Sequence, residues 1–243
     1  MEQERVYYLK VSLLAYIVWI ILFEAVGFYA MTLPASDVTL PLDRQIPLLP
    51  AFIWPYLLCY IFPFLPLAVV TDWQRFNRAL LAIILANAAA FLVYIWLPIA
   101  FPHPELGSSL SDRILALQFR YDFQPGANKL PSLHVTYAWI VYLVCKKQGL
   151  GRLREGLIFV MAVLISVSTL FVKQHILLDV LAGAAWAFAS WFAAGRLYPR
   201  LAAAGAGPAG VLKRIIKSAA LPLMPYTVLL VFLADLYYRR ILP

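Results

Sequence analysis

The chain has 243 residues, of which 63% are hydrophobic and 13% are charged. This composition is typical of an integral membrane protein and excludes an ordinary water-soluble globular domain. The formal net charge of +8 would suggest a nucleic-acid partner in a soluble protein, but here the basic residues lie in short loops between apolar runs, where they set topology and attract anionic lipid.

Seven apolar runs follow one another, each near the length of about 20 residues that crosses a bilayer as a helix. The fourth run is short, and the first is too long for a signal-peptide core, so we expect it to be retained. The predicted fold is all-α: a polytopic transmembrane helix bundle with a six-helix catalytic core and an additional C-terminal span, in one domain over residues 1–243. The runs lie at about 7–32, 51–70, 79–100, 133–146, 156–173, 176–197 and 218–237.

Basic residues predict the orientation of these spans, because they concentrate in cytoplasmic loops. If all seven runs cross, thirteen of the twenty Lys and Arg residues fall on one face. The poorer face is then periplasmic, extracellular or lumenal, and the compact chain favours a bacterial inner membrane. That face holds Arg44, Arg113, Arg120, Lys129, Lys173, Arg239 and Arg240.

A long non-apolar stretch at residues 102–132 separates the third and fourth runs. Its prolines and glycines predict turns, with a short helix near Asp112 to Phe119. Long connections of this kind are commonly functional. The stretch carries His103, Arg113, Arg120 and Lys129, all of which we treat as candidate site residues.

Two polar islands interrupt the apolar sequence on the poorer face. Pro131-Ser132-Leu133-His134 opens the fourth run, and Lys173-Gln174-His175, followed by Asp179, opens the sixth. Ionisable groups at membrane depth are costly and mark a cavity or a chemical step. Because spans four, five and six are consecutive, we expect both openings to meet at one end of the bundle.

The spacing of His175 and Asp179 indicates a nucleophilic histidine. His175 and Asp179 lie four residues apart, so on a helix they share one face. The carboxylate can hold one imidazole nitrogen as N–H and leave the other free to attack, as a nucleophilic histidine requires. His134 can then protonate a leaving oxygen as a general acid.

Phosphate is the substrate group that the surrounding residues favour. Ser132 stands where a helix begins and can cap free N–H groups, which with the helix dipole bind anions. Lys129 and Lys173 flank the two islands and add positive charge. Ser168 and Thr169 end the fifth run, close to the second island.

The islands resemble motifs of the type 2 phosphatidic acid phosphatase superfamily of membrane phosphatases and phosphotransferases. Residues 131–134 are similar to its Pro-Ser-x-His motif, and residues 168–179 to its Ser-Arg-(x5)-His-(x3)-Asp motif, with Thr169 in place of the arginine. The Lys-Gln-His sequence and Leu133 resemble the branch that contains inositol phosphorylceramide and sphingomyelin synthases. The first family motif, Lys-(x6)-Arg-Pro, is not visible, and the resemblance covers a core at about residues 79–197.

The resemblance implies a metal-independent, cofactor-free phosphatase for a lipid phosphate or diphosphate. In it His175 forms a phosphohistidine, His134 protonates the departing oxygen and Asp179 orients His175. Water then takes the phosphoryl group; a second alcohol in its place would make the protein a lipid phosphotransferase. The implied phosphate ligands are Lys129, Lys173, Ser132, Ser168 and Thr169, with Arg113, Arg120 or Lys129 filling the role of the missing first motif.

Two readings from other classes remain open. A metal-dependent hydrolase would use His134, His175 and Asp179 as ligands. A transporter or lipid-binding protein would hold an anionic head group at the same residues without turnover. All of these readings place the protein in a bilayer, and none has a nucleic-acid partner.

Overall fold

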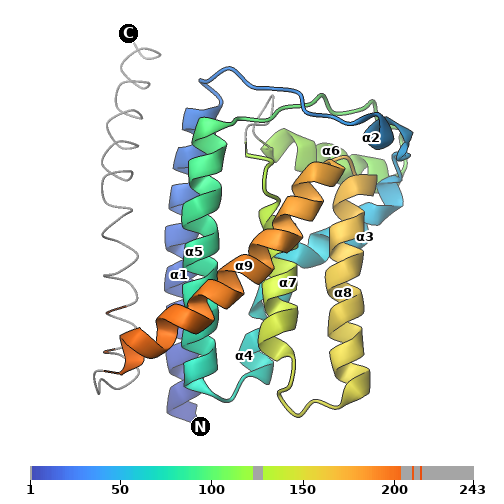
Figure 1. Cartoon of the computed structure of the whole chain (residues 1–243). Coiled ribbons are helices and arrows are strands. Elements are labelled where there is room, and N and C mark those ends of the chain that lie inside the picture. Colours follow the sequence, from blue (N-terminus) through green and yellow to red (C-terminus); the bar gives the residue numbers. More distant parts are fainter. Residues whose placement is uncertain (1, 123–127, 204–209, 211–213, 215–243) are drawn as a thin grey trace.

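The computed structural model describes residues 2–122, 128–203, 210 and 214. Over these residues the protein is all-α, with no strand beyond an isolated bridge between Ser36 and Ile99. The predicted helix bundle is therefore confirmed (Figure 1). The long helices are α1 (Glu2–Ala30), α5 (Trp73–Trp96), α7 (Leu133–Cys145), α8 (Arg152–Phe171) and α9 (Leu177–Ala202).

Five helical segments are long and apolar enough to cross a membrane, and α7 is a shorter apolar helix. They correspond to the first, second, third, fifth and sixth predicted runs, and α7 to the fourth. The seventh run, at 218–237, lies outside the described residues. The short helix expected in the long loop is present as α6 (Leu110–Tyr121).

The second span is broken rather than straight. Prolines at 50, 55, 63 and 66 remove backbone donors and clash with the preceding turn, so a regular helix cannot continue through them. The segment instead winds through short pieces that together still span residues 50–69. These follow α2 (Pro41–Gln45) and are η1 (Pro50–Phe52), α3 (Ile53–Leu57), η2 (Leu58–Tyr60), η3 (Phe62–Phe64) and α4 (Leu65–Val69).

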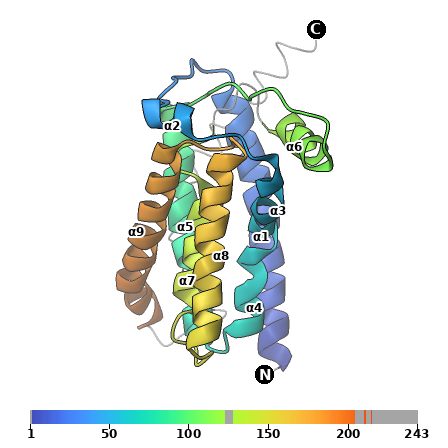
Figure 2. The ribbon, with the colours of Figure 1, turned by 90° about the vertical axis from the view of Figure 1, so that its right-hand side faces the viewer.

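Helix α7 lies at the centre of the bundle and packs against α5, α8 and α9, while α1 runs beside α5 (Figures 1 and 2). Small residues allow α5 and α9 to approach closely, among them Ala86 and Ala187, which are both fully buried. Gly183 fulfils the same role where α9 crosses α7, since a Cβ there would stand 2.5 Å from the Ser132 carbonyl oxygen. This crossing brings the two polar islands together.

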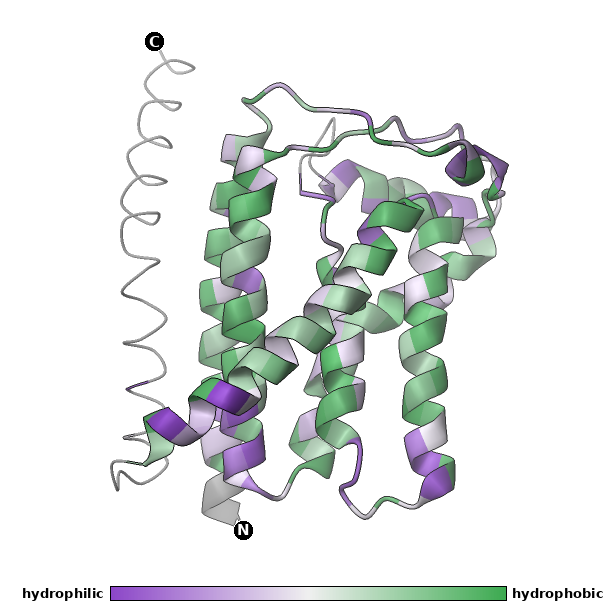
Figure 3. Cartoon of the chain, viewed as in Figure 1, coloured by the Kyte–Doolittle hydropathy of each residue, from purple (hydrophilic) through white to green (hydrophobic). Residues whose placement is uncertain are grey.

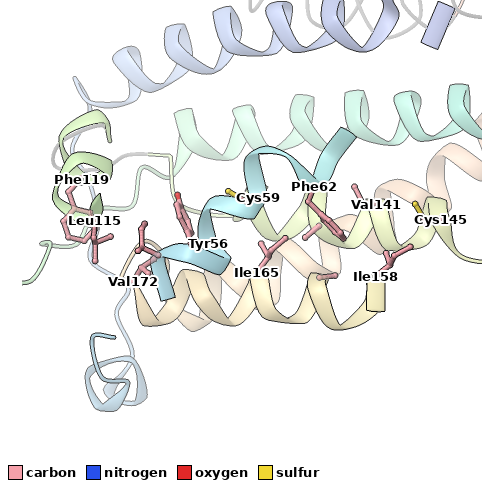
Figure 4. Close-up of a cluster of buried hydrophobic side chains, with 13 residues drawn as sticks. Tyr56, Cys59, Phe62, Leu115, Phe119, Val141, Cys145, Ile158, Ile165 and Val172 are labelled. Carbon is pink, nitrogen blue, oxygen red and sulfur yellow. The ribbon is translucent and has the colours of Figure 1, made fainter. Parts of the chain in front are cut away.

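A hydrophobic cluster ties α6 to the bundle (Figure 4). Leu115 and Phe119 of α6 pack with Tyr56 of α3 and with buried side chains of α7 and α8. Both cysteines, Cys59 and Cys145, are free thiols in this cluster. The loop that leads into the first island is therefore anchored by apolar contacts.

Charged residues gather at the ends of the bundle, and the middle is apolar (Figure 3). One end carries the start of α1, the α4–α5 and α7–α8 loops and the end of α9 (Figure 1). These are the segments to which the basic-rich face was assigned from the sequence. The two polar islands and α6 belong to the opposite half.

Candidate active site

Three predicted side chains form one hydrogen-bonded row. His134, the second residue of α7, places Nδ1 3.2 Å from Nε2 of His175, in the turn before α9. His175 Nδ1 lies 3.1 Å from Oδ2 of Asp179, which is fully buried. The structure thus brings together the nucleophile, acid and orienting carboxylate expected from the sequence.

Tyr56 extends this row and defines its proton positions. Its hydroxyl oxygen lies 3.3 Å from His134 Nε2. Because an ionised carboxylate only accepts, His175 Nδ1 carries hydrogen and its Nε2 presents a lone pair. His134 Nδ1–H then donates to that lone pair, and the Tyr56 hydroxyl donates to His134 Nε2, so each contact has one donor and one acceptor.

Backbone hydrogen bonds hold the turn that carries His175. The N–H groups of Gln174 and His175 both donate to the Thr169 carbonyl, at 3.0 and 3.1 Å. The Ile176 N–H donates to Asp179 Oδ2 at 3.2 Å. Both ends of the turn are fixed, which orients the imidazole before any substrate is present.

Ser168 and Thr169 support this turn from inside α8. Their hydroxyls donate to carbonyls of the same helix, at 2.7 Å for Ser168 and 2.8 Å for Thr169. Both residues are fully buried. The structure therefore places these two predicted phosphate ligands in helix-internal hydrogen bonds.

Ser132 caps α7 and links it to α9. Its Oγ accepts from the Val135 N–H at 3.4 Å, and its own N–H donates to the Asp179 carbonyl at 3.1 Å. The Thr136 hydroxyl bridges the Ser132 and Gly183 carbonyls, at 2.8 and 3.0 Å. The register between His134 and Asp179 is thus fixed by backbone as well as side-chain contacts.

Lys129 is paired with a residue that sequence reasoning missed, Asp122. The Lys129 Nζ lies 2.6 Å from Asp122 Oδ2, and only 2% of the lysine side chain is exposed. His103 Nε2 lies 3.5 Å from the same oxygen, with its ring stacked on Phe119. Burial alone would raise the pKa of Asp122, but Lys129 and His103 together hold it below the usual range.

Lys173 faces a different partner from the one expected. Its ammonium group donates to the carbonyls of Asp43, at 3.1 Å, and Ile46. Burial lowers the pKa of Lys173, while Asp43 opposes that shift. Asp43 is itself buried and accepts from the Leu177 N–H at 2.7 Å, so it caps α9 from a distant segment. Lys173 and Asp43 together clamp the 43–46 segment to the His175 turn.

The other candidate basic residues lie on α6. Arg113 and Arg120 are both exposed there. The described residues contain no group of three or more His, Cys, Asp or Glu side chains arranged to hold a metal ion. His134, His175 and Asp179, the ligands of the metal-dependent alternative, are joined to one another by hydrogen-bond contacts.

Sequence comparison gives a family match. A family model described as the PAP2 superfamily matches residues 18–193, from α1 into α9. Comparison with curated proteins and with solved structures gives no match.

Proposed function

The chain belongs to the PAP2 superfamily, and on this premise we propose that it is a membrane-embedded phosphatase of lipid phosphates or diphosphates that works through a phosphohistidine. The observation that carries the proposal is the row Tyr56, His134, His175 and Asp179. In this row the lone pair of His175 Nε2 and the N–H of His134 Nδ1 face each other across 3.2 Å. The alignment of a nucleophile, its orienting carboxylate and a neighbouring acid is what phosphoryl transfer through histidine needs.

In the first half-reaction the His175 Nε2 lone pair forms a bond to phosphorus, and the bond between phosphorus and the lipid oxygen breaks. The phosphate enters as a monoanion and passes its proton to His134 Nε2, so that His134 is an imidazolium in this step. His134 then gives its Nδ1 proton to the lipid oxygen, which leaves as an alcohol. Asp179 stabilises the positive ring of the phosphohistidine through the Nδ1–H contact. The substrate phosphate enters between the two imidazoles, whose direct contact it replaces.

In the second half-reaction water attacks the phosphohistidine. His134 Nδ1, now without its proton, takes one from the water, and the bond between phosphorus and His175 Nε2 breaks. Inorganic phosphate leaves with the proton from His134 Nε2, and both rings return to their starting states. An alcohol in place of water would give a phosphotransferase by the same steps.

The phosphate oxygens are held by Lys129 and by the N-terminal amides of α7 in this proposal. The first N–H groups of a helix lack intrahelical acceptors and bind anions with help from the dipole. Lys129 is buried with Asp122, which lines the same cavity as His134. Ser168, Thr169 and Lys173 then act by shaping the His175 turn, in view of the contacts that their side chains make.

The proposed orientation puts the site on the non-cytoplasmic side of a bacterial inner membrane. The support is the basic-rich end of the bundle, which lies opposite the half that carries the polar islands and α6. Basic residues favour the cytoplasm, so the site half faces outward.

A direct test is phosphate release from a panel of lipid phosphates and diphosphates, with excess chelator, by the full chain and by His175→Ala. We expect chelator-resistant release that the substitution abolishes. A radiolabelled substrate should leave an acid-labile, alkali-stable label on the protein but not on His175→Ala. Full activity in His175→Ala would refute the mechanism, and label that is discharged only by an added alcohol would identify a phosphotransferase.

A further inference from the structure

A cavity of about 530 Å³ opens beside His134. This volume is in the range of small-molecule sites, roughly 300–1,000 Å³. Its walls come from α1, the segment from η2 to α4, and helices α5, α6 and α7, and most of the lining side chains are hydrophobic. Of the proposed catalytic row, His134 lines the cavity, which extends from there along α7.

Polar groups of the cavity concentrate at the catalytic end. His134 and Asp122 line that end, and the Tyr60 hydroxyl there donates to Gln118 at 3.2 Å. From His134 the cavity follows α7 as far as Val144. Ten residues of helix correspond to about 15 Å, so the cavity is long and narrow and runs along the helices.

Packed side chains close the far end of the cavity, at Phe76, and we call this end the floor. Phe76 lines it and stacks on Tyr8, with ring centroids 4.3 Å apart. Arg75 ties the start of α5 to the end of α7, with Nε 2.6 Å from the Val144 carbonyl oxygen and Nη2 2.9 Å from that of Leu143. Because these contacts join helices at the floor, the depth of the cavity is fixed by the fold.

We propose that this cavity holds one hydrocarbon tail of the substrate and that its floor limits the length of the tail. The inference rests on the proposed function, because it places the phosphate of the same molecule between His134 and His175. A tail gains little by moving from bilayer to protein, since lipid chains are as apolar as the lining side chains. Selection for tail length therefore comes from the shape of the cavity, because a tail that extends beyond Phe76 has no space for its last methylene groups.

The first experiment needs no turnover. Alkyl phosphates that carry a diazirine at the chain end are photolysed with the His175→Ala chain in vesicles, and labelled peptides are found by mass spectrometry. A tetradecyl chain should label the floor, at Phe76, Leu67 or Val144, and a shorter chain should label nearer to His134. Label confined to the lipid-facing side of α1, at Leu13 and Leu14, would overturn the proposal.

The second experiment measures phosphate release from alkyl phosphates of increasing length. Ala15 of α1 lines the cavity, so Ala15→Phe should fill part of the path of a long tail and lower the ratio of kcat/KM for long over short chains by roughly tenfold or more. Leu67→Ala should raise that ratio. Leu14 is exposed on the same helix, and Leu14→Phe is the matched control that should leave the ratio unchanged.

The outcomes separate the two proposals. An equal chain-length ratio in all four proteins, with normal turnover, would overturn the tail site alone. Floor labelling without phosphate release from any substrate would support the tail site and count against the phosphatase.

Discussion

His134 Nδ1 and His175 Nε2 lie 3.2 Å apart, in direct hydrogen-bond contact. In the proposed mechanism the acid, His134, covers the lone pair of the nucleophile, His175, until a phosphate separates the two rings. This contact also keeps the nucleophile unprotonated, since its lone pair accepts from His134 while Asp179 accepts its only hydrogen. In the proposed mechanism His175 can therefore attack phosphorus without first losing a proton.

His134→Ala should lose activity in a way that depends on the leaving group. A lipid alcohol is a poor leaving group and needs the proton from His134, so turnover should fall by roughly 10²–10⁴-fold. An aryl phosphate with an acidic phenol needs no proton and should still form the phosphohistidine. The check is single-turnover labelling with both substrates; equal losses for the two would contradict the assignment of His134 as the acid.

Tyr56→Phe should lower kcat and leave KM nearly unchanged. The substitution removes the hydroxyl that donates to His134 Nε2 and leaves that nitrogen unpaired in a buried place. A lost hydrogen bond of about 1 kcal/mol corresponds to roughly fivefold. Tyr142→Phe, near the C-terminal end of α7, is the control, and a rise in KM for Tyr56→Phe would indicate substrate contact instead of positioning.

The two lysines should give different kinetic signatures. Lys129→Met is combined with Asp122→Asn so that no buried charge is left unpaired, and we expect kcat/KM to fall roughly 10–100-fold, as for a lost charged hydrogen bond. Lys173→Met should mainly lower the unfolding temperature, because it removes the contacts with the 43–46 segment. A larger loss of kcat/KM in Lys173→Met at unchanged stability would reverse the assignment.

Asp43→Ala should destabilise the protein and slow catalysis together. The side chain caps the first turn of α9, and loss of a helix cap costs about 1–2 kcal/mol. Asp43→Asn keeps one oxygen to accept from the Leu177 N–H but loses the one that accepts from the Leu40 N–H, so it should restore part of both properties. Asp37→Ala is the control, since Asp37 accepts from Thr39 within its own exposed loop; equal effects at 37 and 43 would contradict the clamp.

Gly183→Ala should push α9 away from α7. The new Cβ would stand 2.5 Å from the Ser132 carbonyl oxygen and 3.1 Å from the Val135 Cβ, and overpacking of this kind costs about 1–3 kcal/mol. Gly156→Ala, in α8, meets nothing within 4 Å and should be neutral or stabilising. Thermal unfolding in detergent and kcat measure both variants; equal stability would show that the crossing tolerates a methyl group.

The sequence was sufficient to predict the helix bundle and the meeting of His134, His175 and Asp179. Apolar runs of membrane length predict the bundle, and the four-residue spacing of His175 and Asp179 predicts their contact; both are local features of the sequence. The side-chain partners of Lys129 and Lys173 could not be predicted, because they depend on how loops distant in sequence fold back onto the bundle. A lysine beside a motif predicts an anion site, but a buried acceptor on another segment of the chain can bind the same ammonium group instead.

Tyr56, Asp43 and Asp122 were missed for the same reason. Tyr56 lies in an apolar run and carries no sequence signal that separates it from a core aromatic residue. Asp43 caps a helix that begins 134 residues later, and no spacing rule connects the two. The prolines around Tyr56 make the second span irregular, and within this irregular segment Tyr56 of α3 contacts His134.

Helix α7 has thirteen residues, about 20 Å of helix, against a hydrocarbon layer of about 30 Å. It begins below the level at which α8 ends and α9 starts (Figure 1). The proposed catalytic row therefore lies below the rim of the bundle. In the proposed reaction a phosphorylated lipid would meet the row within the depth of the bundle, and water is the reactant that must travel there from the rim.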